Sequence, residues 1–543
     1  MQAGILAAAG IISRIIGLLY RGPLHSVIGD LGLGYYQSAY NYYTIVLLIS
    51  SFSIPSAISK VIAPKLGLKE YRNAHRIFHC SIIYVLVVGA AASLFLFFGA
   101  QWLVQSKEAV PVLRTLAPTV FVYGMLGVLR GYFQAHKSMV QTSVSQILEQ
   151  IVNAIVTVGA AYLLIQGFMG TMEVPVDEAG QVSRATYGAV GSAMGTGAGV
   201  LIALLFMAAI YGLNRRIILR RVARDRHEKV DSYGEIFKMI TCVVTPFIIG
   251  TAVYNLHSTI NNNLYTAIFP KVRGIDTVNI FADWGIFAGQ SMTMSNIPIA
   301  FASAMTSAMI PAVAQSVAAK DRQGAKDKIA KAVKSTMLIS IPCAVGLAVL
   351  AKPVTFLLFS SSTMETLDYS AKLLIVLTPS VVLYALSTVS NSVLQGLGKV
   401  NKPIINAGIA LVLQTGAAVG LLFGTGLDLY AIAIVNSVYS GVVCLLNQFA
   451  VRRAIGYKQE MKTTFLLPLI ASTFMGATAW VVYEALYLWT SSMVISVLPA
   501  IPIAAVVYFV VLIALRGVSE QELRGFPKGY LLVKIAKKCK LMK

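Results

Sequence analysis

Charged side chains are scarce in this sequence, and acidic ones are the scarcest. Asp, Glu, Lys and Arg together make up 12% of the 543 residues, whereas soluble proteins carry about a quarter. Apolar residues make up 57%, and apolar runs of about 20 residues, long enough to cross a bilayer as helices, recur along the whole chain. The strands of a membrane β-barrel would be shorter and would alternate. The composition therefore predicts an all-α polytopic membrane protein.

Motifs of catalysis and of metal binding are also missing from the sequence. It contains no Walker motif, no Ser/His/Asp arrangement and no CxxC pair among its five cysteines. The glycine-rich stretch GAVGSAMGTGAGV lacks the lysine of a P-loop, and its glycines at spacing four predict close helix packing instead: Gly191, Gly195 and Gly199. His75 and His79 have a spacing that allows a metal site, but without an acidic partner interfacial solvation is the favoured interpretation. We expect no enzymatic activity, no cofactor and no metal.

The apolar segments predict fourteen transmembrane helices. The first segment is too long for a cleaved signal peptide and lacks a small-residue cleavage site, so we expect a retained helix with a few polar residues before Met1. The predicted spans are residues 4–29, 41–64, 78–104, 110–135, 143–168, 187–212, 239–268, 285–317, 334–360, 371–396, 404–424, 429–451, 464–488 and 492–515.

Basic residues gather in alternate loops between these spans. The net charge is +22, and most of it lies in one set of loops and in the C-terminal tail. The opposite loops are neutral or acidic, as at Glu173, Asp177, Glu365 and Asp368. This positive-inside pattern places both termini in the cytoplasm. It also accounts for the charge without a nucleic-acid partner.

Two halves of the sequence resemble each other weakly. LGYYQ (residues 33–37) parallels WGIFA (284–288), and LRGYFQAHKS (129–138) parallels LQGLGKVNKP (394–403). Six spans separate the copies, so the repeat is parallel and has a pseudo-twofold axis along the membrane normal, as in some transporters. The predicted domains are an N-lobe of six helices (1–212), a basic cytoplasmic linker (213–238), a six-helix C-lobe (239–455), two appended helices (456–516) and a basic cytoplasmic tail (517–543).

Two arginines lie inside the first predicted span. Arg14 and Arg21 are seven residues apart and share a helix face with Gly10 and Gly17. An arginine within a span is costly, and it normally faces a partner or a water-filled cavity. We predict that Arg14 binds substrate; for Arg21, substrate binding and snorkelling to the interface stay open.

Polar stripes mark three further spans. In the second span Ser53, Ser56 and Lys60 share a face, and snorkelling is the alternative for Lys60. The seventh span presents amide and hydroxyl groups that either bridge helices or line the path of a sugar: Asn255, Ser258 and Asn262. Glu149, in SQILEQIVN of the fifth span, is a candidate for ion coupling or for a structural ion pair. Arg114, Arg130 and Lys352 lie near span ends and are expected at the interface.

The sign of these intramembrane charges indicates the substrate class. A cavity that exports cations needs carboxylates, and Glu149 and Glu484 are the main candidates. Arginine and lysine dominate instead, and guanidinium matches the geometry of phosphate oxygens. The residues therefore predict an anionic substrate bearing phosphate or pyrophosphate.

Several of these segments resemble the MurJ/SpoVB/YtgP-like flippases of the MOP (MATE-like) exporter superfamily. SRIIGLLYR (13–21) resembles the first-helix arginine motif of that family, and residues 34–60 resemble its second-helix signature. SQILEQIVN (145–153) and NIPIAFASAMTSAMIPAVAQ (296–315) are similar to the fifth- and eighth-helix motifs. The resemblance implies a V-shaped fold of two lobes around a cationic cavity. It departs from the family at Asn153, where relatives often have arginine, and at Asn261, where an acidic residue is frequent.

The resemblance also implies a function and a location. The expected activity is that of a flippase in the bacterial cytoplasmic membrane, which moves an undecaprenyl-pyrophosphate-linked saccharide, foremost the peptidoglycan precursor lipid II, from the inner to the outer leaflet. It assigns pyrophosphate binding to Arg14, Arg21 and Lys60. We further expect the lipid tail along the last two helices, a monomer, and coupling to a monovalent ion or to the membrane potential. The alternatives are a flippase for another lipid-linked saccharide, a drug or cation antiporter, and a non-transporting scaffold.

Overall fold

Helices account for all the regular structure in the computed structural model, which describes residues 2–52, 54–175, 177–225 and 230–520. In chain order the helices, with π-helical segments marked η, are α1 (Gln2–Leu19), α2 (Arg21–Leu47), η1 (Leu48–Phe52), α3 (Ile54–Gly67), α4 (Tyr71–Leu103), α5 (Ala109–Ala135), α6 (Met139–Met169), α7 (Glu178–Ala223), α8 (Tyr233–Asn263), η2 (Leu264–Ile268), α9 (Phe269–Arg273), α10 (Thr277–Trp284), η3 (Gly285–Ser291), α11 (Met292–Ala318), α12 (Arg322–Val349), α13 (Ala351–Leu358), α14 (Met364–Gly396), α15 (Asn401–Gly424), α16 (Leu429–Ile455), η4 (Lys462–Leu466), α17 (Leu467–Thr490) and α18 (Met493–Ala514).

Each predicted span coincides with a helical segment of the structure. Eleven helices among the described residues are long and apolar enough to cross a membrane. The first predicted span ends at Gly29, where a φ of 69° breaks the helix, because glycine reaches this region without a steric penalty. The second predicted span begins too late, since the helix resumes directly after Gly29; η1 ends at Phe52, and α3 runs from Ile54 to Gly67.

Helix α7 extends into the residues of the predicted basic linker (213–238). It runs for 46 residues to Ala223, with no proline or glycine after Gly212. Helix α8 then begins with a capping box, in which Ser232 accepts from the backbone of Glu235 and the Glu235 side chain accepts from the backbone of Ser232. This capping box defines the start of α8 at Tyr233.

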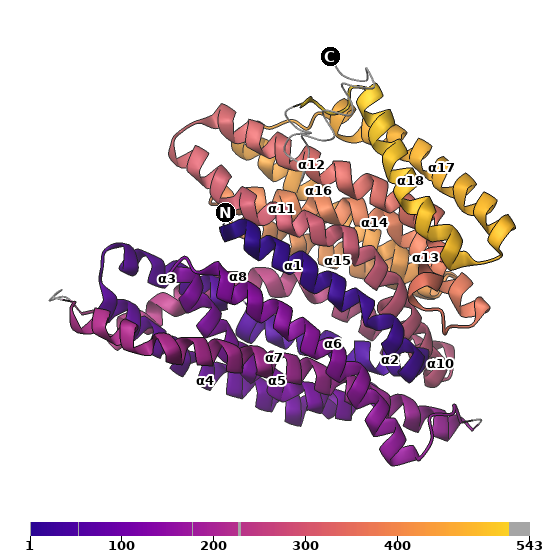
Figure 1. The fold of residues 1–543 in the computed structure, drawn as a ribbon, viewed down its shortest axis with the longest axis horizontal. Coiled ribbons are helices and arrows are strands. Elements are labelled where there is room, and N and C mark those ends of the chain that lie inside the picture. Colours follow the sequence, from indigo (N-terminus) through magenta and orange to yellow (C-terminus); the bar gives the residue numbers. More distant parts are fainter. Residues whose placement is uncertain (1, 53, 176, 226–229, 521–543) are drawn as a thin grey trace. The chain divides into compact units, whose positions relative to one another are not determined.

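The chain forms two compact units. Unit 1 comprises Met1–Gly289 and Ala418–Gly426, and unit 2 comprises Gln290–Ala417 and Leu427–Lys543. In unit 1, α7 packs along α6, α5 and α2, and α5 packs along α4 (Figure 1). In unit 2, α14 packs against α11, α12 and α16, while α17 packs against α18 and α12. The predicted lobe boundaries rest on the sequence repeat, which this division does not test, and they stay a prediction.

The glycine stripe of α7 packs directly on α6, which confirms its interpretation as a helix contact. A Cβ atom at Gly191 would lie 2.4 Å from the backbone nitrogen of Ala161, and one at Gly195 would lie 2.5 Å from that of Thr157. At Gly199 it would lie 2.5 Å from the carbonyl oxygen of Glu149. Small residues at this spacing let two backbones approach closely.

A second pair of glycines allows α2 to cross α10 and η3. A Cβ at Gly34 would lie 1.8 Å from the carbonyl oxygen of Phe281, and a Cβ at Gly285 would lie 2.0 Å from that of Asp30. These two glycines occupy equivalent positions in the repeat of LGYYQ and WGIFA. Around the crossing Tyr35 packs on Phe281, with ring centroids 5.3 Å apart.

Candidate functional site

The two arginines of the first span lie in different environments. Arg14 has an exposed side chain on α1, and it makes no hydrogen bond or ion pair with any residue that the structure describes. Arg21 is half-buried at the start of α2, and its Nη1 donates to the carbonyl oxygen of Gly289 over 3.4 Å. Between them Gly17 faces α6, because a Cβ there would lie 3.6 Å from Gln150 Oε1. The predicted stripe therefore runs beside the polar face of α6.

The residues singled out in the second span lie on α3 and before it. Ser56 and Lys60 are one helical turn apart, and both are exposed. Ser53 lies outside the described residues. The face that Ser56 and Lys60 share is therefore open on α3, although their role in binding stays a prediction.

The polar stripe of α8 bonds to α2. Ser258 donates to Asn41 Oδ1 over 3.3 Å, and the Asn262 amide donates to Ser38 Oγ over 3.3 Å. Asn255 instead bonds within α8, to the carbonyl oxygen of Thr251 at 2.8 Å. These contacts favour helix bridging for Ser258 and Asn262, one of the two roles that the sequence left open.

One end of this stripe keeps an unsatisfied group. Asn262 is completely buried, yet its Oδ1 has no hydrogen-bond partner among the described residues. Next to it, the Tyr42 hydroxyl donates to Asn263 Oδ1. A buried amide oxygen without a donor costs free energy, and such groups concentrate where a structure changes contacts or binds a ligand.

Glu149 forms a buried ion pair with Arg130, whose location the sequence did not predict correctly. Arg130 was expected at the interface, but its side chain is only 4% exposed. Its Nη2 lies 2.7 Å from Glu149 Oε2, and its Nε donates to Ser145 Oγ over 2.9 Å. The signal was present in the sequence, because Ser145 and Glu149 are four residues apart and so share a face of α6.

A second buried pair was not predicted at all. His25 Nε2 lies 2.8 Å from Asp30 Oδ1, and the His25 side chain is 3% exposed. The two residues stand on either side of Gly29, whose positive φ turns the chain and brings them together. In the sequence HSVIGD the glycine indicates a possible break, but it does not predict that the two side chains pair.

The two histidines at spacing four do not form a metal site in the described part of the chain. The ring centroids of His75 and His79 are 4.4 Å apart, and His79 Nδ1 is 2.9 Å from the carbonyl oxygen of His75. No group of three or more metal-ligating side chains occurs among the described residues. The pair therefore lacks the further ligands that a zinc site needs.

Unit 2 contains a large apolar groove of about 860 Å³. Its walls come from α12, α14 and the segment η4–α17, and include Val345, Val382 and Phe465. Lys462 and Thr378 are among its few polar residues. The groove has the dimensions and the lining that suit an aliphatic chain, because pockets for apolar ligands are lined mainly by apolar side chains.

Comparison with known proteins identifies the family of this chain. The profile described as "Lipid II flippase MurJ" matches residues 74–500. The chain belongs to the MurJ family. Members of this family and of the MOP superfamily are transporters and not enzymes, so the chain is a multi-pass membrane transporter, as its composition predicted.

Relatives of the MurJ family align along nearly the whole chain. The lipid II flippase MurJ of Bacillus subtilis (strain 168) is 24% identical over 544 residues, which are 97% of this chain and 95% of that protein. Stage V sporulation protein B of the same organism is 24% identical over 528 residues, covering 96% of each chain. Alignments of this extent include both halves of the predicted repeat.

Solved structures agree with the predicted fold. A lipid II flippase MurJ in an inward closed conformation superposes with a TM-score of 0.64 at 15% identity, covering 93% of this chain and 97% of that one. An inward-facing multidrug resistance MATE transporter of the MOP superfamily gives 0.57 at 18% identity, covering 84% and 95%. The MurJ/MATE fold is thereby confirmed for this chain.

Proposed function

We propose that this MurJ-family transporter moves an undecaprenyl-pyrophosphate-linked saccharide from the inner to the outer leaflet, and that the saccharide is the peptidoglycan precursor lipid II. The observation that carries the proposal is the state of Arg14. It is a permanent cation on an apolar helix, its side chain is exposed, and no described residue neutralises it. An anionic ligand would supply the missing partner.

The carboxylate named as a candidate for binding a cationic substrate already has a partner. Glu149 is held by Arg130 at 2.7 Å and is therefore neutralised within unit 1. The surplus charge of the polar residues around α1 and α6 is then positive. This supports an anion, and pyrophosphate in particular, because guanidinium groups bind phosphate oxygens with charge-assisted hydrogen bonds.

Arg21 and Lys60 extend the same proposal. The carbonyl oxygen that Arg21 contacts is 3.4 Å away, at the long end of the hydrogen-bond range, and a phosphate oxygen would be the stronger acceptor. Lys60 is exposed and presents a flexible point charge. We assign all three cations to the pyrophosphate, with Arg14 as the principal contact.

The lipid tail needs an apolar path that the head group does not share. The groove between α12, α14 and α17 offers about 860 Å³ of mostly apolar volume, and α17 is one of the two helices expected to guide the tail. In the proposed cycle the head group binds on one side, the protein changes its access to the other side, and the tail stays in the bilayer. The membrane potential acting on moved charge is a sufficient energy source for such a step, at about 2.3 kcal/mol per charge and 100 mV.

A rescue assay tests the proposal. Bacteria whose own lipid II flippase can be shut off would express this chain, and growth would be scored with the arrival of labelled lipid II on the outer leaflet. We expect rescue by the unaltered protein and none by Arg14→Ala at equal membrane abundance. Arg216→Ala is the matched control, because Arg216 is also exposed but lies beyond the predicted sixth span.

Three results would contradict the proposal in different ways. Full lipid II transport by Arg14→Ala would remove the arginine from the mechanism. Failure of the unaltered protein, present in the membrane, to rescue would exclude lipid II and point to another lipid-linked saccharide. Export of cationic dyes by the same cells would exclude the anion altogether.

A further inference from the structure

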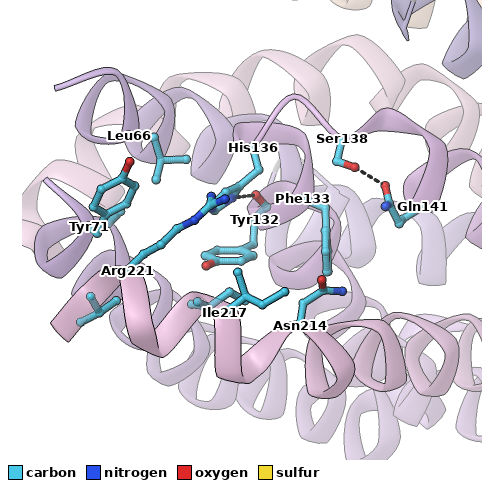
Figure 2. Close-up of a pocket in the computed structure, with 13 residues that line it drawn as sticks. Leu66, Tyr71, Tyr132, Phe133, His136, Ser138, Gln141, Asn214, Ile217 and Arg221 are labelled. Carbon is cyan, nitrogen blue, oxygen red and sulfur yellow. Dashed lines mark hydrogen bonds between the residues drawn. The ribbon is translucent and has the colours of Figure 1, made fainter. Parts of the chain in front are cut away.

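Unit 1 contains a cavity of about 260 Å³, and none of the residues assigned to the substrate lines it. It lies where α5 ends and α6 begins, and it is closed on the other side by the last turns of α7. Leu66 and Tyr71, from the α3–α4 corner, complete the wall (Figure 2). These positions belong to the side of the protein where basic loops predominate.

The cavity has an apolar floor and a polar rim. Tyr132, Phe133 and Ile217 form part of the floor. Asn214, Gln141 and Ser138 supply amide and hydroxyl groups at the rim, where Ser138 donates to Gln141 (Figure 2). A ligand that fits this lining has one apolar part and one part that accepts hydrogen bonds.

The charge of the cavity is positive. Arg221 extends from α7 across the opening toward His136 (Figure 2), and none of the described residues that line the cavity is Asp or Glu. Burial lowers the pKa of the His136 imidazole below its ordinary value of 6.5, and the positive charge of Arg221 acts in the same direction. Arg221 therefore directs its charge into the cavity rather than away from it.

Carboxylates near this corner are already bound elsewhere. Lys65 Nζ lies 2.9 Å from Glu70 Oε2 and 2.6 Å from Asp231 Oδ2. Asp225 Oδ2 accepts a hydrogen bond from the backbone nitrogen of Arg72 at 2.8 Å. Lys65 thus pairs with Glu70 and Asp231, and none of the ion pairs formed among the described residues involves Arg221.

The helix that carries Arg221 has the character of an interfacial segment. Leu213 and Ile217 are 79% and 53% exposed, and arginines alternate with such apolar residues up to Arg224. Exposed leucine and isoleucine beside arginine are typical of a helix at the level of lipid head groups. A ligand at the cavity would then reach it from the membrane surface.

We propose that this cavity binds the head group of an anionic phospholipid, with the phosphate on Arg221 and the rim amides and the glycerol region on the aromatic floor. Basic pockets between transmembrane helices on the cytoplasmic side are suited to such head groups. The site is separate from the transport residues and does not depend on the substrate assigned above. Bound lipid would tie the ends of α5, α6 and α7 together.

A lipid titration of the purified full-length protein tests the site. Thermal unfolding in detergent would be followed with added phosphatidylglycerol, with zwitterionic phosphatidylcholine and with inorganic phosphate. We expect saturable stabilisation by phosphatidylglycerol alone. In Arg221→Gln the half-saturating concentration should rise about tenfold, because a charge-assisted hydrogen bond is lost.

Two variants separate this site from general surface charge. Arg220→Gln removes the same charge from the neighbouring exposed residue, which does not line the cavity, and should leave the half-saturating concentration within about twofold. Ile217→Trp fills the cavity without changing charge and should weaken binding as Arg221→Gln does. Equal effects of the two arginine variants, or full binding in Ile217→Trp, would refute the site, and saturation by inorganic phosphate would refute the lipid.

Discussion

At the residue scale, Arg130 is held within the helix packing by Ser145 and Glu149. An arginine near the end of a span can reach the interface by extending its side chain, and sequence position alone favours that outcome. In the structure Ser145 and Glu149 lie within reach on the neighbouring helix, and the ion pair forms in the interior instead. Tertiary contact between α5 and α6, which hydropathy does not encode, decided the environment of this side chain.

The buried ion pair predicts an asymmetric response to mutation. Arg130→Met leaves the Glu149 carboxylate buried without a cation and should lower the free energy of unfolding by about 3–5 kcal/mol. The double variant Arg130→Met/Glu149→Leu removes both charges and should recover most of this loss. Thermal unfolding in detergent measures both. Arg114→Met, on the same helix, is the control, since Arg114 bonds only weakly to the Phe97 carbonyl at 3.3 Å; an equal loss there would argue against the pair.

His136 predicts a pH dependence of stability. Burial, and next the nearby Arg221, lower the pKa of His136 in the folded protein below 6.5, although the Tyr132 carbonyl acts in the opposite direction. The unfolded chain then binds more protons, so the contribution of His136 to stability is complete above pH 6.5 and is lost as pH falls below that value. His136→Gln should flatten this part of the stability profile. An unchanged profile between about pH 7.5 and pH 5, as measured by thermal unfolding, would contradict the assignment.

At the scale of elements, periodicity and glycine spacing were reliable guides. The apolar runs located the spans, and the spacing of four between glycines located the face where α7 meets α6. The part of α2 that follows Gly29 was not assigned to a span, because Gly32, Leu33 and Gly34 resemble a loop in sequence. The structure buries all three in a helix. The need for close approach at the crossing explains these glycines, and a single sequence does not reveal which partner requires it.

The packing of α6 on α7 predicts a sharp contrast between two glycines. In Gly195→Ala the new Cβ would lie 2.0 Å from Thr157 Oγ1 and 2.5 Å from the Thr157 backbone nitrogen, so the helices must separate. We expect a loss of about 1–3 kcal/mol, as for other overpacked contacts. Gly159→Ala, on α6, meets nothing within 4 Å and should be neutral or slightly stabilising. Comparable melting temperatures for the two variants would show that the helices are not in direct contact at Gly195.

At the scale of the whole molecule, charge distribution and hydropathy predicted the class of protein, and the family match confirmed it. Selectivity of the transporter for lipid II over a related lipid-linked saccharide depends on contacts with the sugar. The positions of the amide groups that would bind sugar hydroxyls cannot be predicted from composition. The polar stripe of α8 illustrates this, because its side chains divide between bonds to α2 and bonds within α8. The orientation predicted from the loop charges can be tested directly.

The predicted orientation can be measured by thiol accessibility. In a background whose five cysteines are replaced by serine, Lys320→Cys would mark a basic loop and Glu173→Cys an opposite loop; both positions are exposed. A membrane-impermeant maleimide added to intact spheroplasts should label the Glu173→Cys variant only, and both variants after lysis. Labelling of the Lys320→Cys variant alone in intact spheroplasts would invert the topology.

The crossing at Gly34 and Gly285 has a consequence for how this protein can diverge. Positions related by an internal duplication usually accumulate changes independently, since each copy has its own neighbours. Here the two equivalent residues cross in one contact, with the carbonyl groups of Phe281 and Asp30 against them. A side chain added at either glycine would press on the same junction, so a substitution at one position restricts what the other position can accept.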